Sequence, residues 1–195
     1  MELFKSNTEL LNSPGELIIY RGHFDDEEDI LENLNQVNFI QNKIIMYGKE
    51  YLVPRLEAWF GDESYTYTGV KLKPLESPIW LNVLKAKVQT ITGNQYNSVL
   101  INKYRNGDDY VSYHQDNEPE LGRNPVIASL SFGSSRKFTL RSLADKNKKV
   151  EIELSHGDLL LMGQNIQYNW EHQLKKSTKS DGIRYNLTFR NIKMS

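Results

Sequence analysis

Cysteine is absent from this chain of 195 residues, and histidine occurs only four times. Without cysteine the chain can hold no disulfide, no thiolate metal site and no cysteine nucleophile, so histidine and carboxylate side chains are the remaining metal ligands. Long hydrophobic runs are also missing. The longest apolar blocks are short, like Leu-Leu-Leu-Met at residues 159–162, whereas a membrane-spanning helix needs about 20 apolar residues. The first residues include Glu2 and Glu9 and no sustained apolar segment, which argues against a secretory signal. We therefore expect a cytoplasmic protein, nuclear as well in a eukaryote, without a membrane partner.

Positive and negative charges are unevenly distributed along the chain, although the net charge is only −1. Residues 136–195 carry 12 Lys and Arg against 6 Asp and Glu, whereas residues 1–135 carry 12 against 19. The basic part could present a positive face to a nucleic-acid backbone. Two solvated surfaces of opposite sign are the plainer interpretation, so charge alone leaves the partner open.

No repeat, low-complexity segment or linker divides the chain, which predicts one domain. Two stretches have the apolar spacing of helices: 24–39, with acidic residues at its start, and 79–92, opened by Pro78 and ended by Gly93. After residue 96 the pattern changes to short segments separated by turn sequences. The predicted strands are 97–104, 110–113, 126–132, 137–141, 149–154, 158–162, 168–173 and 184–190.

Helices followed by short strands predict an α+β, mainly β fold. We expect residues 96–195 to form a jelly-roll core, a double-stranded β-helix of the cupin-like kind, buttressed by helices from a helix-rich part in residues 1–95. Cupin-like metal enzymes use this architecture.

A candidate metal site lies at His114-Gln115-Asp116, followed much later by His172. Two imidazoles and one carboxylate leave three positions of an octahedral iron open, as in non-haem Fe(II) oxygenases, which use them for a keto-acid and O₂. A His-x-Asp sequence alone is weak evidence of a metal site. Here it is followed by a later histidine and then by an arginine-containing strand, in the order that such an oxygenase requires. His156 precedes a Gly-Asp turn, where we expect it to satisfy backbone groups and not to bind metal.

Residues 184–190 supply what such a metal site lacks, a cationic clamp for a small dicarboxylate. Side chains alternate between the two faces of a strand, so Arg184, Asn186, Thr188 and Arg190 share one face. An arginine fork can hold a carboxylate through two parallel hydrogen bonds. The same alternation aligns Leu100, Asn102 and Tyr104. For any single strand, a polar face turned to solvent is the commoner explanation.

These motifs together resemble the AlkB family of Fe(II)- and 2-oxoglutarate-dependent nucleic-acid dealkylating dioxygenases, with the animal-type repair homologues as the nearest subgroup. The resemblance covers residues 46 to 190, and Asn117 departs from it where several repair homologues carry a second Asp. The matching stretches are Val53-Pro-Arg55-Leu-Glu-Ala-Trp59-Phe-Gly61, Tyr65-Thr-Tyr67, Asn102-Lys-Tyr104, His114-Gln-Asp116-Asn-Glu118, Ile127 to Gly133 with Arg136, His156-Gly-Asp158, His172 and Arg184 to Arg190.

The resemblance implies a role for each matching residue, with a nucleotide-recognition part in residues 1–95. The iron ligands would be His114, Asp116 and His172, and the 2-oxoglutarate contacts Asn102, Tyr104, Arg184, Asn186 and Arg190. Residues near the substrate nucleotide would be Tyr65, Tyr67, Trp59, Arg55, Glu118, Arg141 and, as a finger in an exposed turn, Tyr47. Without the resemblance, Tyr65 and Tyr67 could be packing residues and Tyr47 an ordinary loop aromatic.

The implied reaction is oxidative demethylation of bases such as 1-methyladenine or 3-methylcytosine in DNA or RNA. It consumes 2-oxoglutarate and O₂ at Fe(II) and releases succinate and formaldehyde. Such lesions are cationic, which gives Glu118 a reason to lie nearby. We expect a monomer with a nucleic-acid substrate. The alternatives are a 2-oxoglutarate-dependent hydroxylase of a protein or small molecule, and a catalytically silent nucleic-acid-binding homologue.

Overall fold

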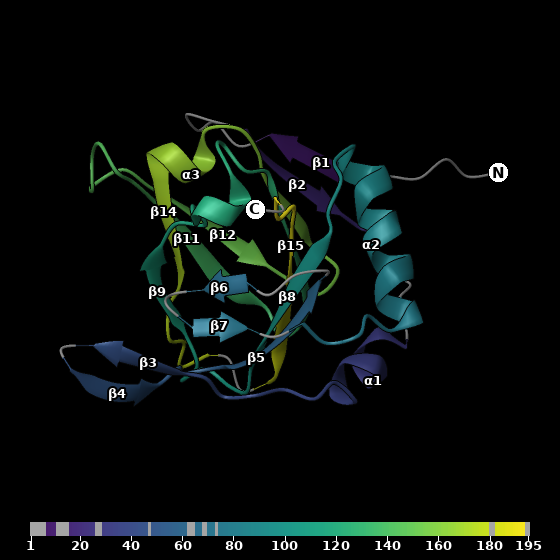
Figure 1. Cartoon of the computed structure of the whole chain (residues 1–195). Coiled ribbons are helices and arrows are strands. Elements are labelled where there is room, and N and C mark those ends of the chain that lie inside the picture. Colours follow the sequence, from purple (N-terminus) through teal and green to yellow (C-terminus); the bar gives the residue numbers. More distant parts are fainter. Residues whose placement is uncertain are drawn as a thin grey trace.

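Two antiparallel sheets lie face to face in this computed structural model (Figure 1), which describes residues 7–10, 16–25, 29–46, 48–61, 65–67, 70–72, 74–179 and 182–193. The larger sheet has the strand order β1 (Asn7–Leu10), β2 (Leu17–Arg21), β13 (Leu159–Met162), β10 (Ile127–Gly133), β15 (Arg184–Arg190), β8 (Ser98–Tyr104) and β5 (Leu56–Gly61). The smaller sheet has the order β12 (Lys149–Leu154), β11 (Arg136–Ser142), β14 (Trp170–Leu174) and β9 (Val111–His114). This arrangement confirms the predicted mainly β, jelly-roll fold.

Smaller elements surround the two sheets. Two hairpins are formed by β3 (Lys43–Met46) with β4 (Lys49–Leu52), and by β6 (Tyr65–Tyr67) with β7 (Val70–Leu72). The helices are α1 (Ile30–Asn35), α2 (Ile79–Thr92) and α3 (Ile166–Asn169), with a 3₁₀ turn at Pro119–Leu121.

The strands predicted after residue 96 are all present, each within two residues of the expected bounds. Strand β15 also confirms the expected alternation. Tyr185, Leu187 and Phe189 pack into a core between the larger sheet and the helices. Every residue of β15 is buried. Its polar face therefore does not point to solvent, which rules out the commoner explanation for a strand with one polar face.

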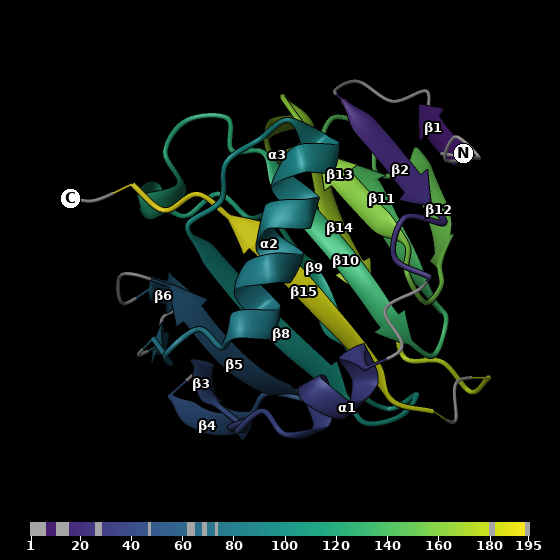
Figure 2. The same ribbon diagram turned by 90° about the vertical axis from the view of Figure 1, so that its right-hand side faces the viewer.

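Helix α2 covers the outer face of the larger sheet (Figure 2) and matches its prediction. Leu81, Leu84 and Val88 form its buried stripe, at the spacing that places side chains on one face of a helix. The helix ends at Gly93, whose φ of 68° is the left-handed conformation that glycine adopts without strain. None of the helices in the described ranges is long and apolar enough to cross a membrane.

The predicted helix over 24–39 is wrong in its extent, because only Ile30–Asn35 is helical among its described residues. Asp29 precedes this helix without a side-chain capping bond. Beyond it, Ile40 pairs with Glu57 of β5 through two backbone hydrogen bonds of 3.0 and 2.8 Å, which draws the segment into extended structure. The expectation of a helix-rich part in residues 1–95 is likewise corrected: its described residues hold seven strands and two helices.

Candidate metal centre and adjoining cavity

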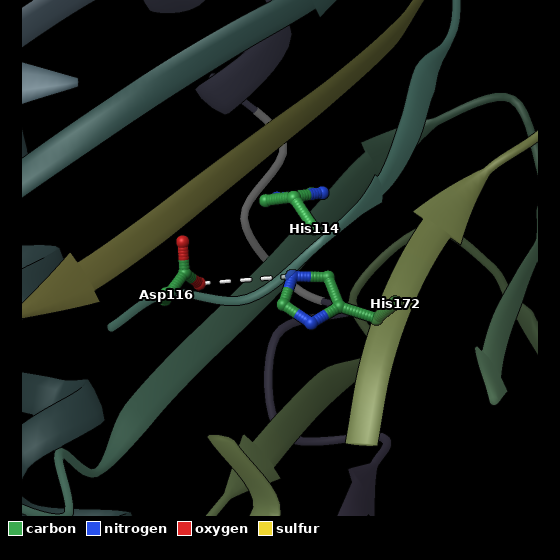
Figure 3. A group of neighbouring side chains, drawn as sticks. All are labelled: His114, Asp116 and His172. Carbon is green, nitrogen blue, oxygen red and sulfur yellow. Dashed lines mark ion pairs between the residues drawn. The ribbon is translucent and has the colours of Figure 1, made fainter. Parts of the chain in front are cut away.

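His114, Asp116 and His172 come together between the two sheets (Figure 3), with potential ligand atoms all within 4.8 Å of one another. His114 ends β9 and lies opposite His172 of β14 in the strand register. The Nε2 atom of His172 is 3.7 Å from Oδ2 of Asp116. Two imidazoles and one carboxylate are suitable ligands for a divalent iron.

The protonation states of these three side chains suit metal binding. Burial, together with the neighbouring His114, lowers the pKa of His172 to about 3. Burial also lowers the pKa of His114, so both imidazoles are neutral at physiological pH. For Asp116, burial acts to raise the pKa, but Arg190, His172 and His114 outweigh it and lower the pKa to about 2. A metal ion would therefore displace no proton from these ligands at neutral pH.

Hydrogen bonds orient two of the three side chains. Nδ1 of His114 lies 2.9 Å from the carbonyl oxygen of Ser112, which can only accept, so Nδ1 carries the proton and Nε2 has the lone pair that a metal requires. Nη2 of Arg190 donates to Oδ1 of Asp116 at 2.7 Å. This contact leaves Oδ2 directed toward His172.

A cavity adjoins the three side chains and is lined on one side by the polar face of β15. Asn186 donates to the hydroxyl oxygen of Ser129 at 2.7 Å, and Thr188 donates to Oδ1 of Asn186 at 3.1 Å. Apolar side chains close the other side. The lining residues are Arg55, Asn102, Tyr104, Val111, His114, Asp116, Ser129, Phe138, Met162, His172, Leu174, Arg184, Asn186, Thr188 and Arg190.

The environment of Arg184 indicates whether this cavity can bind a dicarboxylate. Its side chain is 2% exposed, its Nη2 donates to the Ser131 hydroxyl at 2.9 Å, and the described residues give it no carboxylate partner. Burial lowers its pKa to about 10, which still leaves it protonated at neutral pH. Its guanidinium lies 5.4 Å from the ring centre of Tyr104, whose pKa is raised by burial so that the hydroxyl stays a donor. A buried cation without a counterion fits a ligand that brings a carboxylate.

The structure therefore brings together all eight residues that the sequence suggested for the metal and the 2-oxoglutarate. Arg190 and Asn102 also bond to other residues that line the cavity, which the sequence did not predict. Arg190 is bonded to Asp116, and Oδ1 of Asn102 accepts a hydrogen bond of 2.9 Å from Nε of Arg55.

The residues suggested for the substrate are more dispersed. Trp59 is 2% exposed and packs in the core between the sheets, not on an open surface. Arg55 is buried, lines the cavity and pairs with Glu57 at 2.7 Å. Arg141 pairs with Glu171 at 2.8 Å, and Glu118 is partly buried just beyond Asp116. Tyr47 and the side chains of Tyr65 and Tyr67 lie outside the part of the chain that the structure describes.

Gln167 is a site residue that sequence reasoning missed. Its Oε1 accepts a hydrogen bond of 2.9 Å from the backbone N–H of Asp116, and its carbonyl oxygen accepts one from the side chain of Gln115. These bonds fix the backbone that carries Asp116. A glutamine in a short helix 51 residues away along the chain gives no sequence signal of this contact.

Comparison with known proteins agrees with this geometry. A model of the 2OG-Fe(II) oxygenase superfamily matches residues 19–190. The chain is 40% identical over 188 residues to the human protein "Alpha-ketoglutarate-dependent dioxygenase alkB homolog 3", covering 89% of this chain and 65% of that one. It is 37% identical over 162 residues to human "DNA oxidative demethylase ALKBH2", covering 77% of this chain and 61% of that one.

The chain thus spans less than two thirds of the length of these relatives. A solved structure, "The structure of OsALKBH1", shares the fold with a TM-score of 0.64 at 18% identity, covering 94% of this chain and 100% of that one. The chain belongs to the 2OG-Fe(II) oxygenase superfamily and, within it, to the AlkB family.

Proposed function

We propose that this chain oxidatively demethylates N-alkylated nucleic-acid bases such as 1-methyladenine and 3-methylcytosine. In this proposal His114, Asp116 and His172 bind Fe(II), and the far carboxylate of 2-oxoglutarate lies against Arg184. The observation that carries the proposal is the buried Arg184 guanidinium, which has no carboxylate partner among the described residues and lies in the same cavity as the three metal-binding candidates. The relatives named as a dioxygenase and a DNA oxidative demethylase support the substrate class.

The bound iron and 2-oxoglutarate would supply oxidation of the alkyl carbon by O₂, with conversion of 2-oxoglutarate to succinate and CO₂. The hydroxylated carbon then leaves its base nitrogen as formaldehyde. The protein's own groups act by placement and by charge. Arg190 holds Oδ1 of Asp116 so that Oδ2 stays turned to the metal position. Tyr104 offers a protonated hydroxyl beside Arg184, and Phe138, Met162 and Leu174 exclude water from the cavity wall.

For the base itself we propose Tyr65 and Tyr67 as a stacking platform, with Glu118 near the positive charge of the lesion. Stacking on aromatic rings accepts any base and suits a base that has left its duplex. The excess of Lys and Arg in residues 136–195 is compatible with binding of the nucleic-acid backbone.

The decisive experiment incubates the Fe(II)-loaded protein with 2-oxoglutarate and a panel of methylated DNA and RNA oligonucleotides. Mass spectrometry of the oligonucleotides, with assays for succinate and formaldehyde, should show loss of a methyl group only in the complete mixture. Asp116→Ala is the inactive control. Succinate release without any repaired oligonucleotide would point to a protein or small-molecule hydroxylase, and no succinate release with any member of the panel would point to a silent binding homologue.

A further inference from the structure

Four polar side chains form a chain of contacts from the base of the β3–β4 hairpin to the cavity. Nδ2 of Asn42, just before β3, donates to Oε2 of Glu57 at 2.6 Å. Oε1 of Glu57 pairs with Nη2 of Arg55 at 2.7 Å, and Nε of Arg55 donates to Oδ1 of Asn102 at 2.9 Å. Arg55 and Asn102 line the cavity, whereas Glu57 does not.

The inner part of this chain of contacts is closed to water. Arg55 is 5% exposed, Glu57 2% and Asn102 6%. Transfer of two charges from water to such a site costs free energy that mutual attraction only partly returns, so a buried ion pair is weak evidence of a gain in stability. Such a pair is better explained by the orientation that it imposes on its neighbours.

The orientation imposed here concerns the Asn102 amide. A guanidinium can only donate, so the amide must turn its oxygen to Arg55. The NH₂ group of Asn102 then remains as a donor for another partner. A carboxylate in the cavity would then meet donors: the Asn102 amide, the Tyr104 hydroxyl and the Arg184 guanidinium. If Arg55 moved, the amide could turn over and present an oxygen to that carboxylate.

The same carboxylate also anchors the hairpin. The backbone of Glu57 exchanges two hydrogen bonds with Ile40, and its side chain holds Asn42. The backbone N–H of Val53, which follows β4, donates to the carbonyl oxygen of Asn42 at 2.9 Å. Both ends of the β3–β4 hairpin, which projects from the body in Figure 1, therefore meet at Asn42, which the Glu57 side chain holds.

We propose that Glu57 is a positioning residue that couples occupancy of the co-substrate cavity to the anchoring of the β3–β4 hairpin. It fixes Arg55, and through it Asn102, on one side and Asn42 on the other. This proposal rests on the proposed binding of 2-oxoglutarate in the cavity. Coupling of this kind is reciprocal, so the ligand steadies the hairpin base as much as the hairpin favours the ligand.

The test compares the wild-type protein with Glu57→Gln, both loaded with Mn(II), which binds oxygen and nitrogen ligands without turnover under anaerobic conditions. Calorimetry should show that the variant binds 2-oxoglutarate more weakly, on the order of tenfold, as expected when the partner that orients a binding group is removed. In the wild type, 2-oxoglutarate should slow hydrogen exchange at the amides of Ile40 and Val53, and in the variant it should not. In turnover with Fe(II), the KM for 2-oxoglutarate should rise while kcat at saturation stays near wild type, a division that mere loss of stability would not produce.

Two further variants make the test specific. Glu50→Gln removes an exposed ion pair with Lys43 in the same hairpin and should leave both 2-oxoglutarate affinity and the exchange response unchanged. Asn42→Ala cuts only the hairpin side, so it should abolish the exchange response and leave affinity within about twofold of wild type. This variant also provides the test if Glu57→Gln does not fold.

Unchanged 2-oxoglutarate affinity in folded Glu57→Gln overturns the proposal, as does wild-type exchange at Ile40 and Val53 that 2-oxoglutarate does not alter. Persistence of the exchange response in Asn42→Ala overturns it too. If the wild-type protein fails to bind 2-oxoglutarate at all, the proposed function fails first, and the coupling fails with it.

Discussion

At the scale of single residues, the two oxygens of Asp116 have different tasks. Oδ1 accepts a hydrogen bond from Arg190, and Oδ2 faces His172. An ionised carboxylate held in this way needs little rearrangement to bind a metal, because its orientation is already fixed. Hydrogen bonds within the protein thus hold two of the three proposed ligands, His114 and Asp116, in place.

We expect His114→Ala to abolish Fe(II) binding and turnover while the fold survives. The residue ends β9 and contributes one of three proposed ligands, and a jelly-roll core does not depend on a metal to form. Metal content after dialysis, together with circular dichroism, measures both effects. His156→Ala is the matched control, since His156 accepts from the backbone of Gly133 and lies outside the cavity lining. Wild-type iron content in His114→Ala would remove His114 from the ligand set.

Arg184→Lys is expected to weaken 2-oxoglutarate binding by about tenfold or more, because a point charge replaces a fork that can hold a carboxylate through two hydrogen bonds. The contact of the guanidinium with Tyr104 is lost as well. Binding of Mn(II) should be unchanged, and calorimetric titrations of metal and then of 2-oxoglutarate separate the two. Equal co-substrate affinity in both proteins would contradict the proposed clamp.

The stability of the metal-free protein should fall as pH drops below about 6.5, the usual pKa of histidine in an unfolded chain. The folded-state pKa of His172 is lowered to about 3, so between these values the unfolded chain binds a proton that the folded chain does not. The loss reaches at most about 1.4 kcal/mol per pH unit for each such histidine. Asp116, with a pKa lowered to about 2, contributes stability that is lost only below about pH 4.

Urea unfolding at about pH 7.5 and about pH 5.5 measures this dependence. His172→Gln removes the titrating group and should show a flatter response than wild type. Identical responses would mean that His172 takes up its proton equally well in both states.

At the scale of elements, sequence periodicity predicted best where an element has two distinct faces or a clear beginning and end. Helix α2 was predicted to the residue because Pro78 opens it, Gly93 closes it and its apolar residues lie at helical spacing. Strand β15 was predicted with its polar face, which fixed Arg184 and Asn186 on one side.

Prediction from the sequence failed where tertiary contacts determine the secondary structure or the side-chain partners. Strand β5 is buried almost throughout and has no alternation that distinguishes it from other apolar segments. The segment after α1 is extended because Ile40 pairs with Glu57, a partner that lies 17 residues further along the chain. The hydrogen bonds of Gln167 and of Glu57 were equally invisible, since each joins groups whose closeness depends on the complete fold.

The β3–β4 hairpin leads to a prediction about substrate form. Ile45 is 75% exposed and Leu52 57%, so the hairpin offers apolar surface that the described residues do not cover. We predict that Tyr47, which falls between β3 and β4 in the sequence, wedges into a base stack, an interaction that matters only where the target base is paired and stacked. Tyr47→Ala should reduce demethylation of duplex oligonucleotides and leave single-stranded substrates nearly unaffected.

The control for this prediction is Tyr67→Ala, which should reduce demethylation of both substrate forms. A base from either a single strand or a duplex needs an aromatic ring on which to stack. Rates on matched single-stranded and duplex oligonucleotides decide the matter. An equal loss on both forms in Tyr47→Ala, or none on either, means that Tyr47 is an ordinary loop aromatic.

At the scale of the whole molecule, the cavity lies between the two sheets, so its ligands should hold the sheets together. A ligand present at 100 times its Kd stabilises the folded state by about 2.7 kcal/mol, and 1 kcal/mol shifts Tm by about 2–4 °C in a domain of this size. We expect Mn(II) with 2-oxoglutarate to raise Tm by about 5–10 °C over the EDTA-treated protein. In Arg184→Lys, 2-oxoglutarate at the same concentration should raise Tm only slightly beyond the effect of Mn(II) alone. A wild-type Tm that neither ligand alters would mean that neither binds the folded protein at the concentration used.

The register between β15 and β8 restricts how this protein can diverge. Arg184 lies opposite Tyr104, and Asn186 lies opposite Asn102, and all four side chains line the cavity. A residue inserted at the start of β15 would exchange the two faces of that strand and turn residues such as Tyr185 and Leu187 toward the ligands. Descendants of this sequence can therefore replace side chains in these strands one at a time, but changes of length have to fall in the connections.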